Sequence, residues 1–167
     1  FLLIDLSASM DEGGGEVSKA DMAILASSLL GYAASVRGMS LGALLFAREP
    51  LRYFEPRKGK GQALAIIEAA LALSGSPQGA SVPVRAVAGL GGPGRGPTAE
   101  ALGVALDTAG RLLKRRSLVI ASSDFHARGY ESSLARLGRR HDLVALRLTD
   151  ALDRHLPAWG SFLVRDA

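Results

Sequence analysis

Three oxygen-bearing side chains at alternating positions follow the first apolar segment of the chain. Residues 1–6 are apolar except for Asp5, and Ser7 and Ser9 continue the pattern Asp-x-Ser-x-Ser. A buried strand that ends in this pattern directs carboxylate and hydroxyl oxygens into one small volume just beyond the sheet edge. Hard oxygen donors with few charges suit Mg²⁺, which keeps several of its own waters in a near-octahedral shell. We therefore expect a site for Mg²⁺, or for Mn²⁺, at the end of this strand.

Two further oxygen donors are expected at the same sheet edge. Asp124 follows the apolar run 118–121, which has the composition of another buried strand, and Thr98 stands at the start of the helix expected before that strand. Ligands of open α/β sheets bind beyond the carboxyl ends of the strands. The proposed set has two carboxylates, whose formal charge of −2 balances one divalent ion, and three hydroxyls: Asp5, Ser7, Ser9, Thr98 and Asp124.

Each of these residues also has a purely structural interpretation. Serine is common in turns, and Asp124 or Thr98 alone would be explained as a helix or turn cap. Their joint position at strand ends favours the shared site. One alternative function is a metal-assisted phosphohydrolase, although aspartate-based phosphotransferases use a second acid where Ser7 stands. We expect no enzyme, because no catalytic proton relay is visible; a metal-free scaffold is a third interpretation.

The composition limits the other function classes. The chain has 167 residues, 48% of them hydrophobic, with no cysteine and a net charge of +4. This length fits one domain spanning residues 1–167, and the lack of cysteine excludes disulfides and thiolate metal ligands. Basic residues gather at 57–60 and 114–116, but aromatic residues are only 5% and do not accompany them, so we expect no nucleic-acid partner.

The apolar runs are too short to cross a membrane. All of them fall far below the ~20 residues that span a bilayer, so we expect a cytoplasmic segment without membrane contact of its own. Phe1 lies inside an expected core strand. We therefore expect the chain to be excised from a longer protein, and an upstream membrane anchor in that protein is compatible with the sequence.

Strand and helix patterns alternate along the chain, which predicts an α/β fold with three layers. The expected sheet is Rossmann-like, doubly wound and mostly parallel, with one antiparallel edge strand. Strands are predicted at 1–6, 41–46, 51–54, 118–121, 143–148 and 161–164. Helices are predicted at 18–36, where Met22, Leu25 and Leu29 recur at helical spacing, and at 62–73, 98–113, 130–140 and 150–156. The stretch 74–97 is rich in Gly, Pro and Ser and is predicted to be a long loop.

The order of these motifs resembles a von Willebrand factor A (vWA) domain with a metal-ion-dependent adhesion site (MIDAS). Within that fold the chain is most similar to the bacterial DUF58 family. The matching segments are IDLSASM at 4–10, LLFAREP at 44–50, Pro-Arg-x-Gly at 56–59, Thr98 before a helix, and Ser-Asp-Phe at 123–125. A late motif matches at Asp150, Leu156, Pro157 and Gly160, while Asp153 replaces a glutamate of the family.

The resemblance implies a role for each proposed ligand. Ser7 and Ser9 would coordinate Mg²⁺ through their hydroxyls, and Thr98 would do so directly or through water. Asp5 and Asp124 would act mainly through waters and would orient the hydroxyls. One coordination position would stay open for an Asp or Glu of a partner protein. The resemblance thus implies metal-dependent protein binding, with a MoxR-type AAA+ ATPase as a candidate partner.

Overall fold

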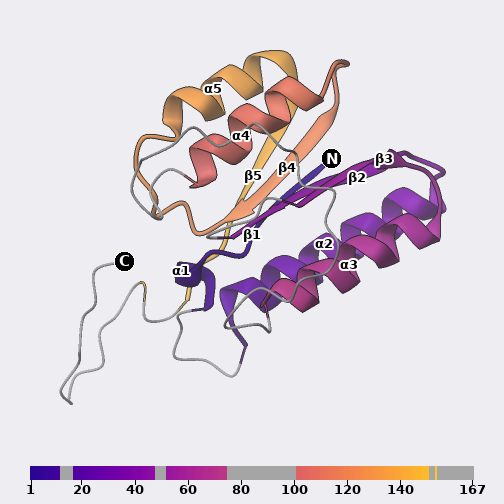
Figure 1. Ribbon diagram of the computed structural model, residues 1–167, viewed down its shortest axis with the longest axis horizontal. Coiled ribbons are helices and arrows are strands. Elements are labelled where there is room, and N and C mark those ends of the chain that lie inside the picture. The colour runs from indigo at the N-terminus through magenta and orange to yellow at the C-terminus, as the bar shows by residue number, and fades with distance from the viewer. Residues whose placement is uncertain (12–16, 48–51, 75–100, 151–152, 154–167) are drawn as a thin grey trace.

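The computed structural model describes residues 1–11, 17–47, 52–74, 101–150 and 153. Strands and helices alternate along most of this part of the chain (Figure 1). The elements, in chain order, are β1 (Leu2–Asp5), α1 (Ala8–Asp11), α2 (Lys19–Val36), β2 (Leu41–Phe46), β3 (Arg52–Arg57), α3 (Lys60–Ser74), α4 (Ala101–Leu112), β4 (Leu118–Ser123), α5 (Glu131–Arg140) and β5 (Asp142–Arg147).

The strands form one five-stranded sheet in the order β3-β2-β1-β4-β5. Strand β1 lies parallel to β2 and β4, β4 lies parallel to β5, and only β3 runs antiparallel to its neighbour β2. The predicted α/β class, the mostly parallel sheet and the antiparallel edge strand are therefore confirmed. The chain places β2 and β3 on one side of β1 and then adds β4 and β5 on its other side. The sheet therefore reverses its winding between β1 and β4. The carboxyl ends of these two strands are where open α/β sheets bind ligands.

Helices cover both faces of the sheet, which gives three layers (Figure 1). Helices α2 and α3 pack on one face around a core that includes Ile4, Leu45 and Ile66. Helices α4 and α5 cover the other face around Leu3, Phe46, Leu106 and other apolar side chains. Strands β1 and β2 are buried along their whole length, which explains why their sequences are continuously apolar rather than alternating.

Helix α2 is confirmed, but its predicted apolar stripe faces outward. Its N-terminus is closed by a capping box between Ser18 and Asp21. The buried side chains are mostly small, Ala20, Ala23, Ile24, Ser27 and Gly31 among them, whereas Met22, Leu25, Leu29, Leu30 and Ala33 are exposed. Small residues let the helix lie close to β2 and α3, since a Cβ on Gly31 would lie 3.2 Å from the Leu41 side chain.

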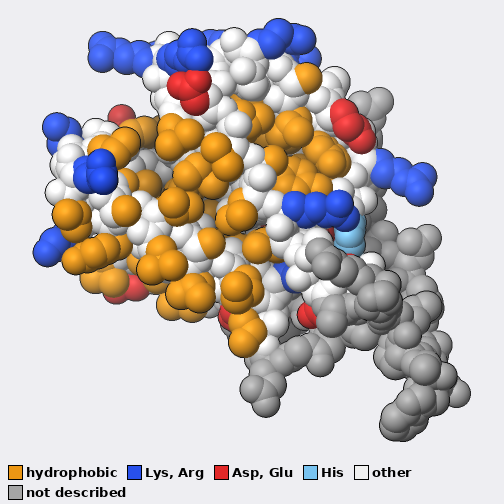
Figure 2. Space-filling model, turned by 180° about the vertical axis from the view of Figure 1, so that it is seen from behind, with side chains coloured by type: hydrophobic (Ala, Val, Ile, Leu, Met, Phe, Trp, Pro, Cys, Tyr) orange, Lys and Arg blue, Asp and Glu red, His pale blue; other side chains and the backbone are white. Residues whose placement is uncertain are grey.

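Apolar side chains are therefore prominent on the surface. Leu29, Val36 and Leu64 are each more than half exposed. Figure 2 shows hydrophobic side chains over much of the face that it presents, with most Lys and Arg side chains around its border. No helix within the described ranges is long and apolar enough to cross a membrane.

Some predictions fall outside the described residues. These are the strand at 161–164, most of the loop at 74–97, and all but Asp150 and Asp153 of the helix at 150–156. The short helix α1 was not predicted, because its four residues are too few to show a helical period.

Candidate metal centre

Asp5 organises the turn that follows β1. Its carboxylate is only 4% exposed, and Oδ1 accepts a hydrogen bond of 2.9 Å from the backbone N–H of Ser7. An Asp side chain that bonds the backbone two residues later forms an Asx-turn, which reverses the chain without needing glycine. The turn leads into α1 and brings the hydroxyls of Ser7 and Ser9 within 3.2 Å of each other. The pattern Asp-x-Ser-x-Ser thus gathers its side chains as the sequence predicts.

Ser123 holds the other oxygen of Asp5 from the neighbouring strand. The register pairs Ile4 with Ser122, so the next residues along the two strands meet. The Ser123 hydroxyl donates a hydrogen bond of 2.5 Å to Asp5 Oδ2 and accepts one of 3.1 Å from the backbone N–H of Phe125. Both oxygens of Asp5 are therefore engaged within the protein, which suits a residue that positions its neighbours.

Burial raises the pKa of Asp5, because a carboxylate loses hydration when it is shielded from water. The hydrogen bonds from Ser123 and Ser7 act in the opposite direction, and the charge of Asp124 raises the pKa further. The last effect arises because a carboxylate is harder to ionise beside another negative charge. A cation near this pair would relieve the repulsion and favour the ionised forms.

Asp124 presents an unsatisfied oxygen at the end of β4. The residue is 2% exposed, and its Oδ1 accepts a hydrogen bond of 3.1 Å from the N–H of His126. Its Oδ2 is buried and has no hydrogen-bond partner among the described residues. The next residue, Phe125, has a φ of +55°, a conformation that is uncommon for residues other than glycine. Strained backbone of this kind is retained where a side chain must be held in a particular direction.

Among the described residues, two side-chain nitrogens approach this oxygen. Lys19 Nζ and His126 Nδ1 each lie 3.6 Å from Asp124 Oδ2, at ion-pair distance rather than hydrogen-bond distance. The Lys19 side chain is only 5% exposed, and its Nζ also lies 3.3 Å from Asp153 Oδ1. The His126 side chain is 44% exposed, so it lies both beside Asp124 and in contact with solvent.

The expected formal charge of −2 is unchanged when the two further charged side chains Lys19 and Asp153 are counted. Two carboxylates, Asp5 and Asp124, together with the ammonium of Lys19, give a sum of −1, and Asp153 restores −2. Neither Lys19 nor Ser123 was among the predicted site residues. In the sequence, Lys19 is distinguished only by its position after the serine that caps α2 and by being the one basic residue of that helix.

The residues present fit a divalent ion of the kind that sequence analysis predicts. The hydroxyls of Ser7 and Ser9 lie 3.2 Å apart just beyond β1, and Asp124, at the end of the neighbouring strand β4, has a buried oxygen with no hydrogen-bond partner among the described residues. All of these oxygens are hard donors. In the part of the chain that the structure describes, no three His, Cys, Asp or Glu side chains group as a metal cluster. A metal ion at this site would therefore be bound by the neutral hydroxyls of Ser7 and Ser9 as much as by charged carboxylates. Thr98, the remaining predicted ligand, lies outside the described residues.

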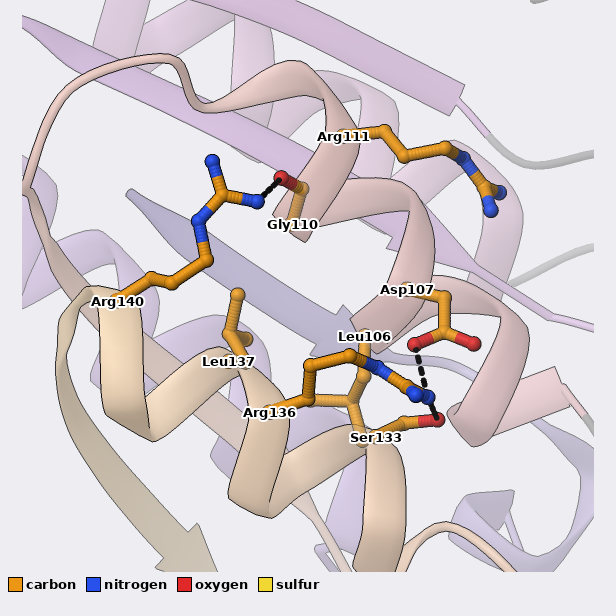
Figure 3. Close-up of a pocket in the computed structure, with 8 residues that line it drawn as sticks. All are labelled: Leu106, Asp107, Gly110, Arg111, Ser133, Arg136, Leu137 and Arg140. Carbon is orange, nitrogen blue, oxygen red and sulfur yellow. Dashed lines mark hydrogen bonds and ion pairs between the residues drawn. The ribbon is translucent and has the colours of Figure 1, made fainter.

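A separate shallow pocket of about 300 Å³ lies between α4 and α5 (Figure 3). Two of the arginines that line it are hydrogen-bonded within the protein. Arg136 donates to Asp107 at 3.0 Å, and Arg140 donates to the backbone oxygen of Gly110 at 3.0 Å. None of the predicted ligands lines this pocket, so it is distinct from the candidate metal centre.

Comparison with known proteins identifies a family model that matches residues 1–167 and is described as "Protein of unknown function DUF58". The chain is also 26% identical over 168 residues to uncharacterized proteins of Mycobacterium bovis and Mycobacterium tuberculosis. The match covers 100% of this chain and 47% of each relative. The chain therefore spans about half the length of the curated relatives that it matches.

Proposed function

This chain belongs to the DUF58 family, and from that premise we propose that it is a protein-binding module that works through a divalent metal ion. The observation that carries the proposal is the buried arrangement at the ends of β1 and β4. Asp5 is held by Ser7 and Ser123, while one buried oxygen of Asp124 has no hydrogen bond from any described residue. A buried carboxylate oxygen without a hydrogen bond is costly, and binding of a hydrated cation would reduce that cost.

Mg²⁺ or Mn²⁺ would be held here as in the MIDAS of a vWA domain. Ser7 and Ser9 supply hydroxyl ligands, and Thr98 would add a third. Asp5 positions the Ser7 backbone through its Oδ1, and both Asp5 and Asp124 would accept hydrogen bonds from metal-bound waters. Since the hydroxyls carry no charge, the ion would remain electron-poor and would favour a further anionic ligand.

The open position would take an Asp or Glu side chain of a partner protein. Without the ion, the carboxylates of Asp5 and Asp124 repel an incoming acid; with the ion, the local charge becomes attractive. Binding of the partner would therefore depend on the metal. A MoxR-type AAA+ ATPase, the partner class that the family resemblance suggests, is the first candidate to test, in a cytoplasmic setting.

The experiment compares the melting temperature with and without Mg²⁺ in the wild type and in Ser7→Ala/Ser9→Ala. A ligand at about 100 times its Kd stabilises by about 2.7 kcal/mol, which is a rise of about 5–10 °C for a domain of this size. We expect this rise in the wild type and none in the double variant. Ser35→Ala/Ser74→Ala is the matched control, because both hydroxyls bond helix carbonyls in exposed positions. A wild type that shows no shift with excess Mg²⁺ or Mn²⁺ contradicts the proposal.

Binding of the partner is tested second. The chain and the ATPase are mixed in Mg²⁺ and in chelator, and co-purification is measured. We expect retention in Mg²⁺ only, and loss of retention in the Ser7→Ala/Ser9→Ala variant.

A further inference from the structure

We propose that Lys19 is a built-in cation that competes with the divalent ion for Asp124, and that Asp153 weakens this competition by drawing the ammonium away. The inference rests on the proposed function, and it adds a regulator to the same site. It starts from a buried charge that the proposed ligand set does not use, because neither Lys19 nor Asp153 belongs to that set.

The position of Lys19 is unusual for a lysine. Its side chain is 5% exposed, although lysine is almost never fully buried unless it is paired. It occupies the first position of α2, immediately after the cap at Ser18, where the helix dipole disfavours a positive charge. The acids around the ammonium therefore decide its location, and the capped helix end holds the lysine backbone in place.

The ammonium is shared between two carboxylates. Its Nζ lies 3.6 Å from Asp124 Oδ2, and it donates to Asp153 Oδ1 and Oδ2 at 3.3 and 3.4 Å. Asp153 is itself held by a hydrogen bond of 2.8 Å from the backbone N–H of Asp150 to its Oδ2. His126 Nδ1, also 3.6 Å from Asp124 Oδ2, is the other nitrogen that faces this oxygen.

Competition follows from the location of Asp124. The oxygen near the ammonium is the one to which no described residue donates a hydrogen bond, and it is therefore available to a hydrated ion. A divalent ion beside Asp124 would be repelled by the ammonium at short range in a buried environment, where charges are weakly screened. Removal of the Lys19 charge should therefore strengthen binding of the ion by about tenfold or more.

Asp153 acts on the metal through Lys19. Because Asp153 holds the ammonium by the shorter contacts, its loss leaves Asp124 as the acid that contacts Lys19 within the described part of the chain. The ammonium then pairs more closely with Asp124, and binding of the ion weakens. Removal of Lys19 and removal of Asp153 should therefore change the affinity in opposite directions, whereas damage to the fold would lower it in both.

The test is calorimetric titration of Mg²⁺, repeated with Mn²⁺, into the wild type, Lys19→Met, Asp153→Asn and the double variant. We expect about tenfold tighter binding in Lys19→Met and several-fold weaker binding in Asp153→Asn. In the Lys19→Met background, Asp153→Asn should have little effect, which a double-mutant cycle measures. Lys60→Met is the matched control, since this exposed lysine begins α3 and its loss changes the net charge by the same amount.

The outcomes separate the two proposals. If the wild type binds Mg²⁺ and Lys19→Met binds it no more tightly than Lys60→Met does, the competition is refuted while the metal-dependent function stands. If neither the wild type nor Lys19→Met binds Mg²⁺ or Mn²⁺, both proposals fail. If Lys19→Met does not fold, the Asp153→Asn variant is the test, because the Asp153 side chain is partly exposed. An affinity for Mg²⁺ that is unchanged in Asp153→Asn overturns the inference.

Discussion

Ser123→Ala should destabilise the protein markedly, although it removes a single oxygen atom. The hydroxyl is 1% exposed and donates to the buried carboxylate of Asp5 at 2.5 Å. A hydrogen bond to a charged group contributes about 1.5–3 kcal/mol. The variant also leaves the Phe125 N–H without the acceptor that it has at 3.1 Å. We expect a loss of about 2–3 kcal/mol in the free energy of unfolding, which is a fall of about 5–10 °C in the melting temperature.

The assay is urea unfolding, followed by circular dichroism. Ser117→Ala is the matched control, because the Ser117 hydroxyl bonds a backbone oxygen at an exposed position just before the same strand; its loss should change stability by less than about 0.5 kcal/mol. If Ser123→Ala costs no more than Ser117→Ala, the hydrogen bond between Ser123 and Asp5 does not hold the site together, and the structural basis given for the metal centre is wrong.

Three further predictions concern the rest of the fold. Gly42→Ala should lower the free energy of unfolding by about 2–3 kcal/mol, since a Cβ there would lie 2.8–2.9 Å from three heavy atoms. Gly61→Ala, where a Cβ would have nothing within 4 Å, should be neutral or stabilising in the same urea assay. Burial, followed by nearby arginine charges, lowers the pKa of His141 from 6.5. The unfolded chain therefore takes up a proton first, and the stability of the fold falls as the pH drops below 6.5. His141→Gln should make the melting temperature less dependent on pH in that range, and an unchanged slope would exclude His141 as the cause. Arg116→Ala should leave the urea midpoint close to that of the wild type, because its ion pair with Asp142 is largely exposed, and a clear loss of stability would contradict this.

The main features of the fold could be predicted from the sequence because the signals are local. Residues 2–5 and 41–46 are continuously apolar, as expected for strands buried on both faces. The helix at 19–36 has a serine cap and a glycine at its end. Its buried face could not be predicted, since apolar residues occur on all sides of the helix. Packing against the sheet selects the small residues such as Ala23 instead of the large ones such as Leu29.

The candidate site could be predicted only in part, for a related reason. Asp5, Ser7 and Asp124 stand at strand ends, and that position can be read from the chain. Ser123 is an ordinary serine until the register of β1 and β4 brings it to Asp5. The burial of Lys19 depends on acids more than one hundred residues away along the chain, which no local pattern reveals. The metal ligation itself stays a prediction.

The most direct test of the metal centre is nuclear magnetic resonance of the labelled protein during addition of Mn²⁺, whose unpaired electrons broaden nearby signals. A metal beyond the carboxyl ends of β1 and β4 predicts that the backbone amide signals of Ser7, Ser9 and Asp124 disappear first. The amides of Gly38 and Gly59, which lie by the opposite ends of the sheet strands, should remain sharp, and Mg²⁺ should restore the lost signals. Uniform broadening, or loss first at Gly38 and Gly59, would contradict a metal site at Asp5 and Asp124.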